Sequence, residues 1–159
     1  MKYLLLFALA CITSVLSMAQ SGQDRDAVKK VIIAFQDDFN NGSFHSSAYT
    51  TNDWVHINPG GGMTRGRDAV LKEVKEVHQT FLKGVTMTID SMIIRFITPT
   101  VAVANVINKM SHYELPAGVS HDNERQIKTY IIVKHKNSWL LSHDHNTVVQ
   151  GSNTAVDTH

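Results

Sequence analysis

The sequence has 159 residues, of which 43% are hydrophobic and 18% are charged, and its formal net charge is +1. A chain of this length is long enough for one globular domain and too short for two of ordinary size. Because the charges nearly balance and the basic residues form no cluster, the composition argues against nucleic acid as a partner. It argues equally against electrostatic binding to a membrane surface.

The first 19 residues have the pattern of a secretory signal peptide. Lys2 supplies a positive charge, residues 4–16 form an apolar run, and Ser17 and Ala19 are the small residues expected before a cleavage site. The apolar run is shorter than the roughly 20 residues that a permanent membrane anchor needs. We therefore expect cleavage after Ala19 and an exported chain, periplasmic or secreted, without membrane contact after cleavage. A buried N-terminal helix is the alternative.

Loss of this segment would change the chemistry that the chain can offer. Lys2 and the only cysteine, Cys11, would leave with it, so that acidic and basic residues become equal in number. Without a thiol, the mature chain can form no disulfide, cysteine nucleophile or cysteine metal site. All nine histidines remain, and histidine is the side chain whose charge changes near neutral pH. A lipid anchor at Cys11 is an alternative interpretation of the segment.

The rest of the chain predicts helices first and long strands afterwards. Apolar residues recur at helical spacing from Val28 to Phe39, and Gly42 is a typical helix end, with Asp37 and Asp38 expected near the solvated face. Later segments alternate with the period of two that is typical of strands. The expected order is helix, short helix, strand, helix and four strands, at residues 21–41, 43–50, 54–58, 65–83, 85–97, 101–113, 126–136 and 139–149. Residues 150–159 have little apolar content, and we expect a disordered tail there.

This element order predicts an α+β fold. Four long strands with short links favour an antiparallel meander, whose apolar face needs a cover. The two amphipathic helices are the only cover available, so we expect them on the concave side of a curved antiparallel sheet. A sheet wrapped around a long N-terminal helix makes a cone, and the wide mouth of a cone is a natural pocket.

Several local patterns follow one another along the chain. They are Phe-Asn-Asn-Gly at 39–42, Trp-Val-His-Ile-Asn at 54–58 followed by glycines and Arg-Gly-Arg-Asp-Ala-Val at 65–70, His78 with Phe81 and Gly84, and a last strand at 139–147 that ends in His-Asn-Thr. In this order they resemble the nuclear-transport-factor-2-like superfamily, and most closely its SnoaL-like, SgcJ/EcaC-type branch. The resemblance implies a cystatin-like α+β barrel over residues 20–149 and a homodimer formed through the exposed sheet face.

The resemblance leaves the activity open, because the superfamily includes steroid isomerases, polyketide cyclases, dehydratases, epoxide hydrolases and binding or assembly domains. The steroid isomerases carry a carboxylate base at the end of the first strand, where this chain has Asn58 before Pro59. Their protonated acid on the fifth strand has no clear counterpart, since Lys128 and Thr129 lie nearby. The resemblance therefore does not extend to that two-acid mechanism.

The leading hypothesis is an exported small-molecule-binding domain with a partly polar, histidine-containing pocket. His56 and Asn58 share one strand face, His143 and His145 share another, and His78 approaches from a helix. The expected binding residues for a small apolar or amphipathic molecule are Trp54, His56, Asn58, His78, Tyr113, His143 and His145. Each of these histidines can also be read as a structural or surface residue.

Two further readings remain open. A cofactor-free lyase, isomerase or hydrolase would use His145 and His78 as catalytic acid and base. A dimeric assembly module would have a cavity that is merely packed. We expect no cofactor and no metal, although His143 and His145 could hold zinc if His135 or His56 supplied a third ligand.

Overall fold

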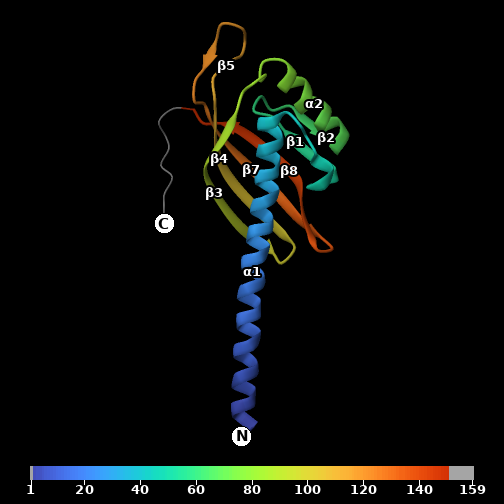
Figure 1. The fold of residues 1–159 in the computed structure, drawn as a ribbon, viewed down its shortest axis with the longest axis vertical. Coiled ribbons are helices and arrows are strands. Elements are labelled where there is room, and N and C mark those ends of the chain that lie inside the picture. Colours follow the sequence, from blue (N-terminus) through green and yellow to red (C-terminus); the bar gives the residue numbers. More distant parts are fainter. Residues whose placement is uncertain (1, 151–159) are drawn as a thin grey trace.

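The computed structural model describes residues 2–150 (Figure 1). The expected disordered tail therefore lies, apart from Gln150, outside the described residues. The elements are α1 Lys2–Asn41, the 3-10 helix η1 Ser46–Ala48, β1 Thr50–Ile57, β2 Met63–Arg65, α2 Arg67–Gln79, β3 Met87–Thr98, β4 Val101–Met110, β5 Tyr113–Glu114, β6 Ser120–His121, β7 Arg125–His135 and β8 Ser138–Val148. Among the described residues, no helix combines the length and the apolar character that crossing a membrane requires.

The main sheet has the strand order β2-β1-β8-β7-β4-β3 and bends around one part of α1 (Figure 1). The four long strands β3, β4, β7 and β8 pair antiparallel in this order, which confirms the predicted meander. The sheet is nevertheless mixed, because β1 runs parallel to β8. Helix α1 packs against β3 and β8, and α2 packs against β1 and β2. The predicted α+β cone is confirmed.

Helix α1 is longer at its start than the periodicity predicted, since it begins at Lys2 and includes most of the expected signal peptide. Its end is as predicted. Gly42 takes the left-handed conformation with φ +62°, and its N–H bonds to the Phe39 carbonyl. A Cβ at Gly42 would lie 3.2 Å from Cε1 of His78, so the helix ends where this imidazole packs. Cleavage after Ala19 stays a prediction.

A β-bulge in β8 decides which side chains of the last strand face the helices. Leu141 pairs with Ile132 of β7, whereas His143 pairs with the adjacent Ile131, so that Ser142 is an extra residue. An extra residue reverses the alternation beyond it. Leu141 is buried before the bulge, and Asp144 is buried after it. His143 and His145 therefore lie on the outer face of the sheet.

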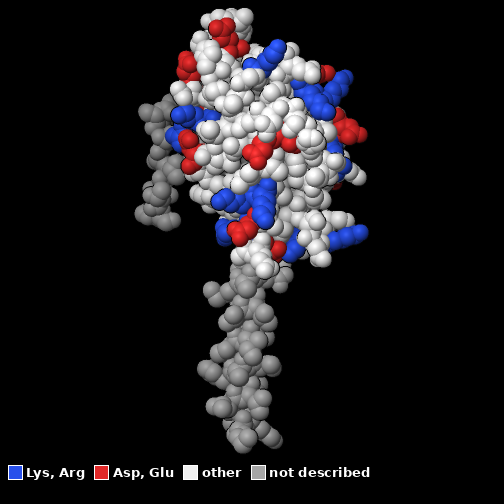
Figure 2. Space-filling model, in the orientation of Figure 1, with Lys and Arg blue, Asp and Glu red and all other residues white. Residues whose placement is uncertain are grey.

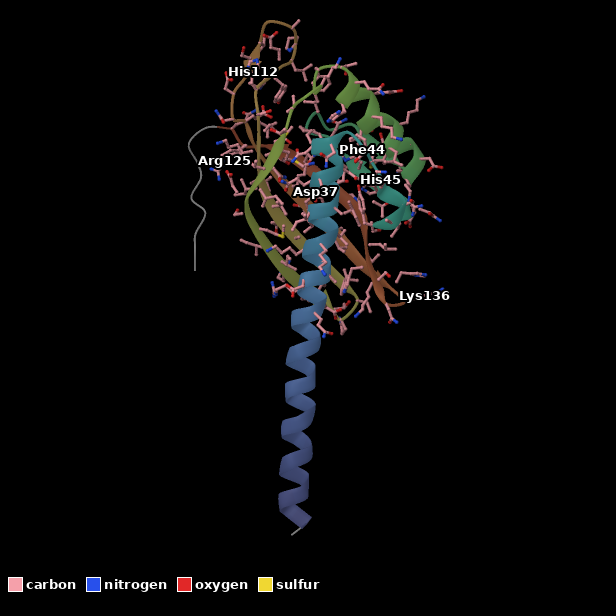
Figure 3. The ribbon with its side chains drawn as sticks, viewed as in Figure 1. Asp37, Phe44, His45, His112, Arg125 and Lys136 are labelled. Atoms are coloured by element: carbon pink, nitrogen blue, oxygen red, sulfur yellow. The ribbon has the colours of Figure 1, made fainter. Side chains whose placement is uncertain are left out.

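The turn between β7 and β8 is displaced by one residue from its predicted place. The two turn residues are Lys136 and Asn137, not Asn137 and Ser138. Lys136 takes a positive φ of 54° (Figure 3), a conformation that side chains other than glycine and asparagine seldom adopt. The strand pairing on either side is unaffected, because His135 still pairs with Ser138.

Asp38 is buried, which corrects the expectation that it lies near the solvated face of α1, whereas Asp37 is exposed. Its carboxylate accepts hydrogen bonds from the Tyr49 hydroxyl at 2.7 Å, the Ser43 hydroxyl at 3.2 Å and the backbone N–H of His45. Asp38 thus ties the end of α1 to the segment that leads into β1. Burial opposes ionisation, but these hydrogen bonds outweigh it and lower the pKa of Asp38 below its ordinary value of 3.8.

We expect Asp38→Ala to lower the free energy of unfolding by roughly 2–4 kcal/mol at pH 7, because the buried Tyr49 hydroxyl and two other donors would lose their acceptor. Asp37→Ala, one residue away and exposed, should change it by less than about 0.5 kcal/mol. The carboxylate stabilises the fold fully above its unfolded pKa, and this contribution is lost as the pH falls through the lower folded value. Urea denaturation of both variants at pH 7 and near pH 3 is the measurement. Equal losses in the two variants at pH 7 would contradict the assignment.

Candidate functional site

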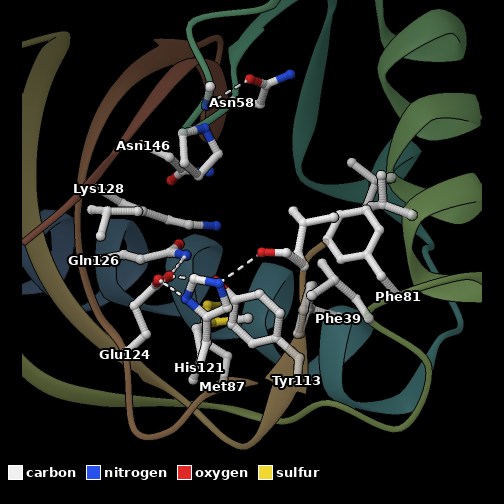
Figure 4. Close-up of a pocket in the computed structure, with 18 of the residues that line it drawn as sticks. Phe39, Asn58, Phe81, Met87, Tyr113, His121, Glu124, Gln126, Lys128 and Asn146 are labelled. Atoms are coloured by element: carbon white, nitrogen blue, oxygen red, sulfur yellow. Dashed lines mark hydrogen bonds and ion pairs between the residues drawn. The ribbon is translucent and has the colours of Figure 1, made fainter. Parts of the chain in front are cut away.

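A cavity of about 510 Å³ lies between the two helices and the inner face of the sheet (Figure 4). Its apolar wall consists of Phe35, Phe39, Val74, Val77, Phe81, Leu82, Met87, Met110, Leu115 and Val148. Its polar lining consists of His56, Asn58, Glu73, Tyr113, His121, Glu124, Gln126, Lys128 and Asn146. The cavity thus has the mixed character of a small-molecule site, with apolar walls and a few polar groups on one side.

Asp144 organises the inner end of this polar side. Its side chain is completely buried, and it accepts hydrogen bonds from Trp54 Nε1 at 2.7 Å and from His56 Nδ1 at 2.8 Å. A carboxylate with no exposed surface needs such donors. Because Nδ1 of His56 donates to Asp144, the neutral imidazole carries its lone pair on Nε2. Among residues 2–150, no group forms a hydrogen bond with that nitrogen.

Lys128 lies beside this pair on β7. It is 4% exposed, and its ammonium nitrogen lies 4.7 Å from the centre of the Phe35 ring. Figure 4 shows the side chain extending into the open centre of the cavity. Burial lowers the pKa of Lys128, and the negative charge of Asp144 opposes the shift only in part.

A second polar cluster is centred on Glu124 near the β5–β6 hairpin. Its carboxylate accepts hydrogen bonds from the Tyr113 hydroxyl at 2.6 Å, Gln126 Nε2 at 2.8 Å and His121 Nδ1 at 2.9 Å. Nε2 of His121 lies 2.9 Å from the Leu115 carbonyl oxygen, so both ring nitrogens face acceptors. This arrangement favours the protonated imidazole. The Leu115 carbonyl, followed by Glu124, raises the pKa of His121, while burial and Glu124 raise that of the Tyr113 hydroxyl.

The known proteins to which this chain is similar are solved structures. No family model and no curated protein sequence matches the chain. A protein with a cystatin-like fold from Caulobacter vibrioides is 25% identical with a TM-score of 0.74, over 79% of this chain and 89% of that one. An NTF2-like protein with a cystatin-like fold from Novosphingobium aromaticivorans is 14% identical with a TM-score of 0.73, over 90% and 93% of the two chains.

The chain has the NTF2-like fold. A candidate ketosteroid isomerase from Shewanella frigidimarina shares it, at 21% identity and a TM-score of 0.65, over 76% of this chain and 94% of that one. The fold that the local sequence patterns implied is thereby confirmed. The narrower SnoaL-like assignment stays a prediction.

The NTF2-like cavity brings together only part of the expected binding set. His56, Asn58 and Tyr113 line it, as expected. Trp54 is 1% exposed and lies in the core, with its indole bonded to Asp144. His78 does not line the cavity, because its ring packs edge-on against Phe39 and Phe44 at the end of α1.

His143 and His145 do not line the cavity either, which corrects the expectation that they enter it. The bulge at Ser142 turns both to the outer face, and Asp144 and Asn146 take the inner positions. The alternative zinc site loses His56 as a third ligand for the same reason, since it lies on the inner face. Within the described part of the chain, no three histidine, cysteine or acidic side chains are grouped as metal ligands would be.

Asn58 lines the cavity, but its amide is already engaged in the turn that follows β1. Its Oδ1 accepts the N–H groups of Gly60 and Gly62, each at 3.0 Å, and its Nδ2 donates to Glu73 at 3.1 Å. A Cβ at Gly62 would come within 2.6 Å of Nδ2, so glycine is required there. The amide therefore holds the turn against α2 and has little capacity left for a ligand.

Sequence reasoning missed most of the polar lining: Glu73, Glu124, Gln126, Lys128, Asn146 and the hairpin residue His121. Strand alternation was the available signal for the β7 residues, since Gln126 and Lys128 have the parity of the buried Tyr130 and Ile132. His121 and Glu124 fall in a segment that reads as a polar loop, and no periodicity marks them.

We expect the imidazole of His121 to titrate above 6.5 in a histidine NMR titration, because it donates to a carboxylate and a carbonyl. Glu124→Gln should lower this midpoint, whereas Asp53→Asn, an exposed charge change on β1, should not. The contacts of the cation stabilise the β5–β6 hairpin below the unfolded pKa of about 6.5, and this contribution is lost as the pH rises through the folded value. A midpoint that Glu124→Gln leaves unchanged would contradict the assigned pair.

Proposed function

We propose that the chain is an exported domain that binds a small, largely apolar or amphipathic molecule. The observation that carries the proposal is the cavity of about 510 Å³ with apolar walls and a polar side. Ligand pockets in proteins typically measure about 300–1,000 Å³. Their apolar walls bury most of the ligand, and a few polar groups fix its orientation. Aromatic and aliphatic side chains from α1 and α2 would cover the apolar part of the molecule.

The electrostatics favour a ligand without a large charge. Lys128 lies near the buried Asp144, and His121 is paired with Glu124 on the same polar side of the cavity. On the molecular face in Figure 2, positive and negative side chains are interspersed, with no extended patch of one sign. Steering of a highly charged ligand would need such a patch. Export rests on the signal-peptide pattern of residues 1–19, and it would place the domain in the periplasm or outside the cell.

We expect 2-naphthol, a fused aromatic with one hydroxyl, to raise the melting temperature, since a ligand at ten times its dissociation constant stabilises the fold by about 1.4 kcal/mol. Val77→Trp fills the cavity from α2 and should abolish the shift. Ile93→Trp adds the same group on the outer face of β3, and the shift should persist. Thermal-shift titration of the three proteins is the measurement. An equal shift in Val77→Trp would show that 2-naphthol binds elsewhere.

A cofactor-free lyase, isomerase or hydrolase is the second candidate, and the His56–Asp144 pair favours it. A buried carboxylate holds the imidazole in one orientation and leaves Nε2 on the cavity side to take or give a proton. His56 would thus have the acid-base role that the sequence suggested for His145 and His78. The structural similarity to a candidate ketosteroid isomerase is consistent with this reading but concerns the fold.

We also propose that two copies pair through the outer face of the sheet. That face exposes large aliphatic side chains, with Ile93 60%, Ile97 49% and Ile127 40% exposed. Their parity is opposite to that of the residues that cover α1, so α1 cannot shield them. These side chains lie on β3 and β7, the two strands on either side of β4, and exposed apolar surface of this kind is typical of a protein interface.

The double variant Ile93→Glu/Ile127→Glu should convert a dimer into a monomer, because two carboxylates would be buried without partners in the paired state. Met63→Glu is the matched control, since Met63 is 54% exposed but lies on β2 at the other edge of the sheet. Sedimentation velocity across a concentration series gives the mass of each species. A wild-type chain that stays monomeric throughout would contradict the proposal.

A further inference from the structure

Lys128 has an environment that is unusual for a lysine. It is 4% exposed, and no group among residues 2–150 accepts a hydrogen bond from its nitrogen. The nearest charge that favours its ammonium form is Asp144, but both oxygens of Asp144 are bonded to Trp54 and His56. An ammonium has three donors, and burying them without acceptors is costly. Burial therefore shifts Lys128 toward the neutral amine.

A neutral amine in a pocket with apolar walls is a nucleophile. Desolvation of a lysine among apolar groups is one of the standard ways in which proteins activate this side chain for attack on carbonyl carbons. The Phe35 ring lies on one side of the nitrogen, and the cavity lies on the other. Lys134, by contrast, is bonded at 2.6 Å to Asp24 and is held as an ion pair.

We propose that Lys128 forms an imine with an aldehyde or ketone of largely apolar character that enters the cavity. The inference rests on the proposed function, because the walls must first bind the apolar part of the molecule. It adds the class of ligand, a carbonyl compound, and the residue that captures it. Covalent capture would hold such a ligand in one orientation. Its carbonyl carbon would lie at Lys128 on β7, and its apolar body would lie between α1 and α2.

The chemistry needs no other reactant. The amine nitrogen attacks the carbonyl carbon, the C–N bond forms, and the carbonyl oxygen takes up the proton that the nitrogen releases. The C–O bond of this carbinolamine then breaks, the hydroxyl takes a proton and leaves as water, and the nitrogen gives up its remaining proton. The products are one imine and one water.

Two neighbours on the same side of the cavity suit these proton transfers. His56 lines the cavity while Asp144 holds Nδ1, so Nε2 can first take the proton that the attacking nitrogen releases and then deliver it to the departing hydroxyl. Asn146 presents a buried Oδ1 without a partner among the described residues, and it also lines the cavity. An acceptor of this kind can orient the hydroxyl of the carbinolamine.

The test uses 2-naphthaldehyde with sodium cyanoborohydride, which reduces an imine to a stable secondary amine. We expect one adduct per chain, mapped to Lys128 by peptide mass spectrometry. Its rate should exceed that of the exposed lysines, because a lowered pKa leaves more of the side chain as the neutral amine near pH 7. Lys128→Met should lose the adduct, whereas Lys109→Met, which removes an exposed lysine on β4, should keep it. Thermal unfolding of Lys128→Met checks that the fold remains.

The outcomes separate this inference from the proposed function. Labelling of Lys128 no faster than that of exposed lysines, or the same adduct yield in a folded Lys128→Met protein, would overturn the imine. If 2-naphthol still raised the melting temperature in that case, the small-molecule-binding function would stand without it. Selective labelling of Lys128 that excess 2-naphthol slows would support both, because the two molecules would compete for one cavity.

Discussion

The buried carboxylate of Asp144 is the constraint on which the site depends. An ionised group without exposed surface persists in a core only when donors satisfy its oxygens, and here Trp54 and His56 supply them from β1. These two bonds cross the one parallel pairing of the sheet, between β1 and β8. The same charge orients the imidazole and opposes the neutralisation of Lys128. The carboxylate of Asp144 therefore affects three things: the pairing of β1 with β8, the tautomer of His56 and the charge of Lys128.

Helices and strands that bury one continuous apolar face were predictable, because their apolar residues recur at a regular spacing. The spacing is helical in a helix and two residues in a strand. The helix that ends at Asn41, α2 and the four long strands all follow this rule. Strands β2, β5 and β6 have two or three residues each, too few to show a period. The sequence placed Arg65 at the start of a helix and Tyr113 at the end of a long strand, and it read the other residues of these strands as turn or loop. The parallel placement of β1 beside β8 could not be read either, since it depends on contacts between residues about 90 positions apart.

The candidate site was harder to predict than the fold for two physical reasons. One extra residue, Ser142, reverses the facing of β8, and nothing in its local composition marks a bulge. Strand β7 carries aliphatic residues on both faces, with Ile132 inside and Ile131 on the outer side, so alternation alone does not say which face holds Lys128. When a sheet has apolar residues on both faces, the alternation of polar and apolar residues no longer identifies the inner face. The polar residues of that face then cannot be located from the sequence.

The charges in the cavity bear on which molecules it can select. Asp144 and Glu124 both bear on the polar side of the cavity. Asp144 lies behind the lining with its oxygens bonded to Trp54 and His56, and Glu124 is paired with His121. A ligand carboxylate would gain the ammonium of Lys128 but would stand near both anions, and its own desolvation would add to the cost. A neutral carbonyl compound avoids that cost, keeps its apolar body against Phe35 and the helices, and offers Lys128 an electrophile. The arrangement that leaves this amine without an acceptor therefore also disfavours the anions that would otherwise occupy it.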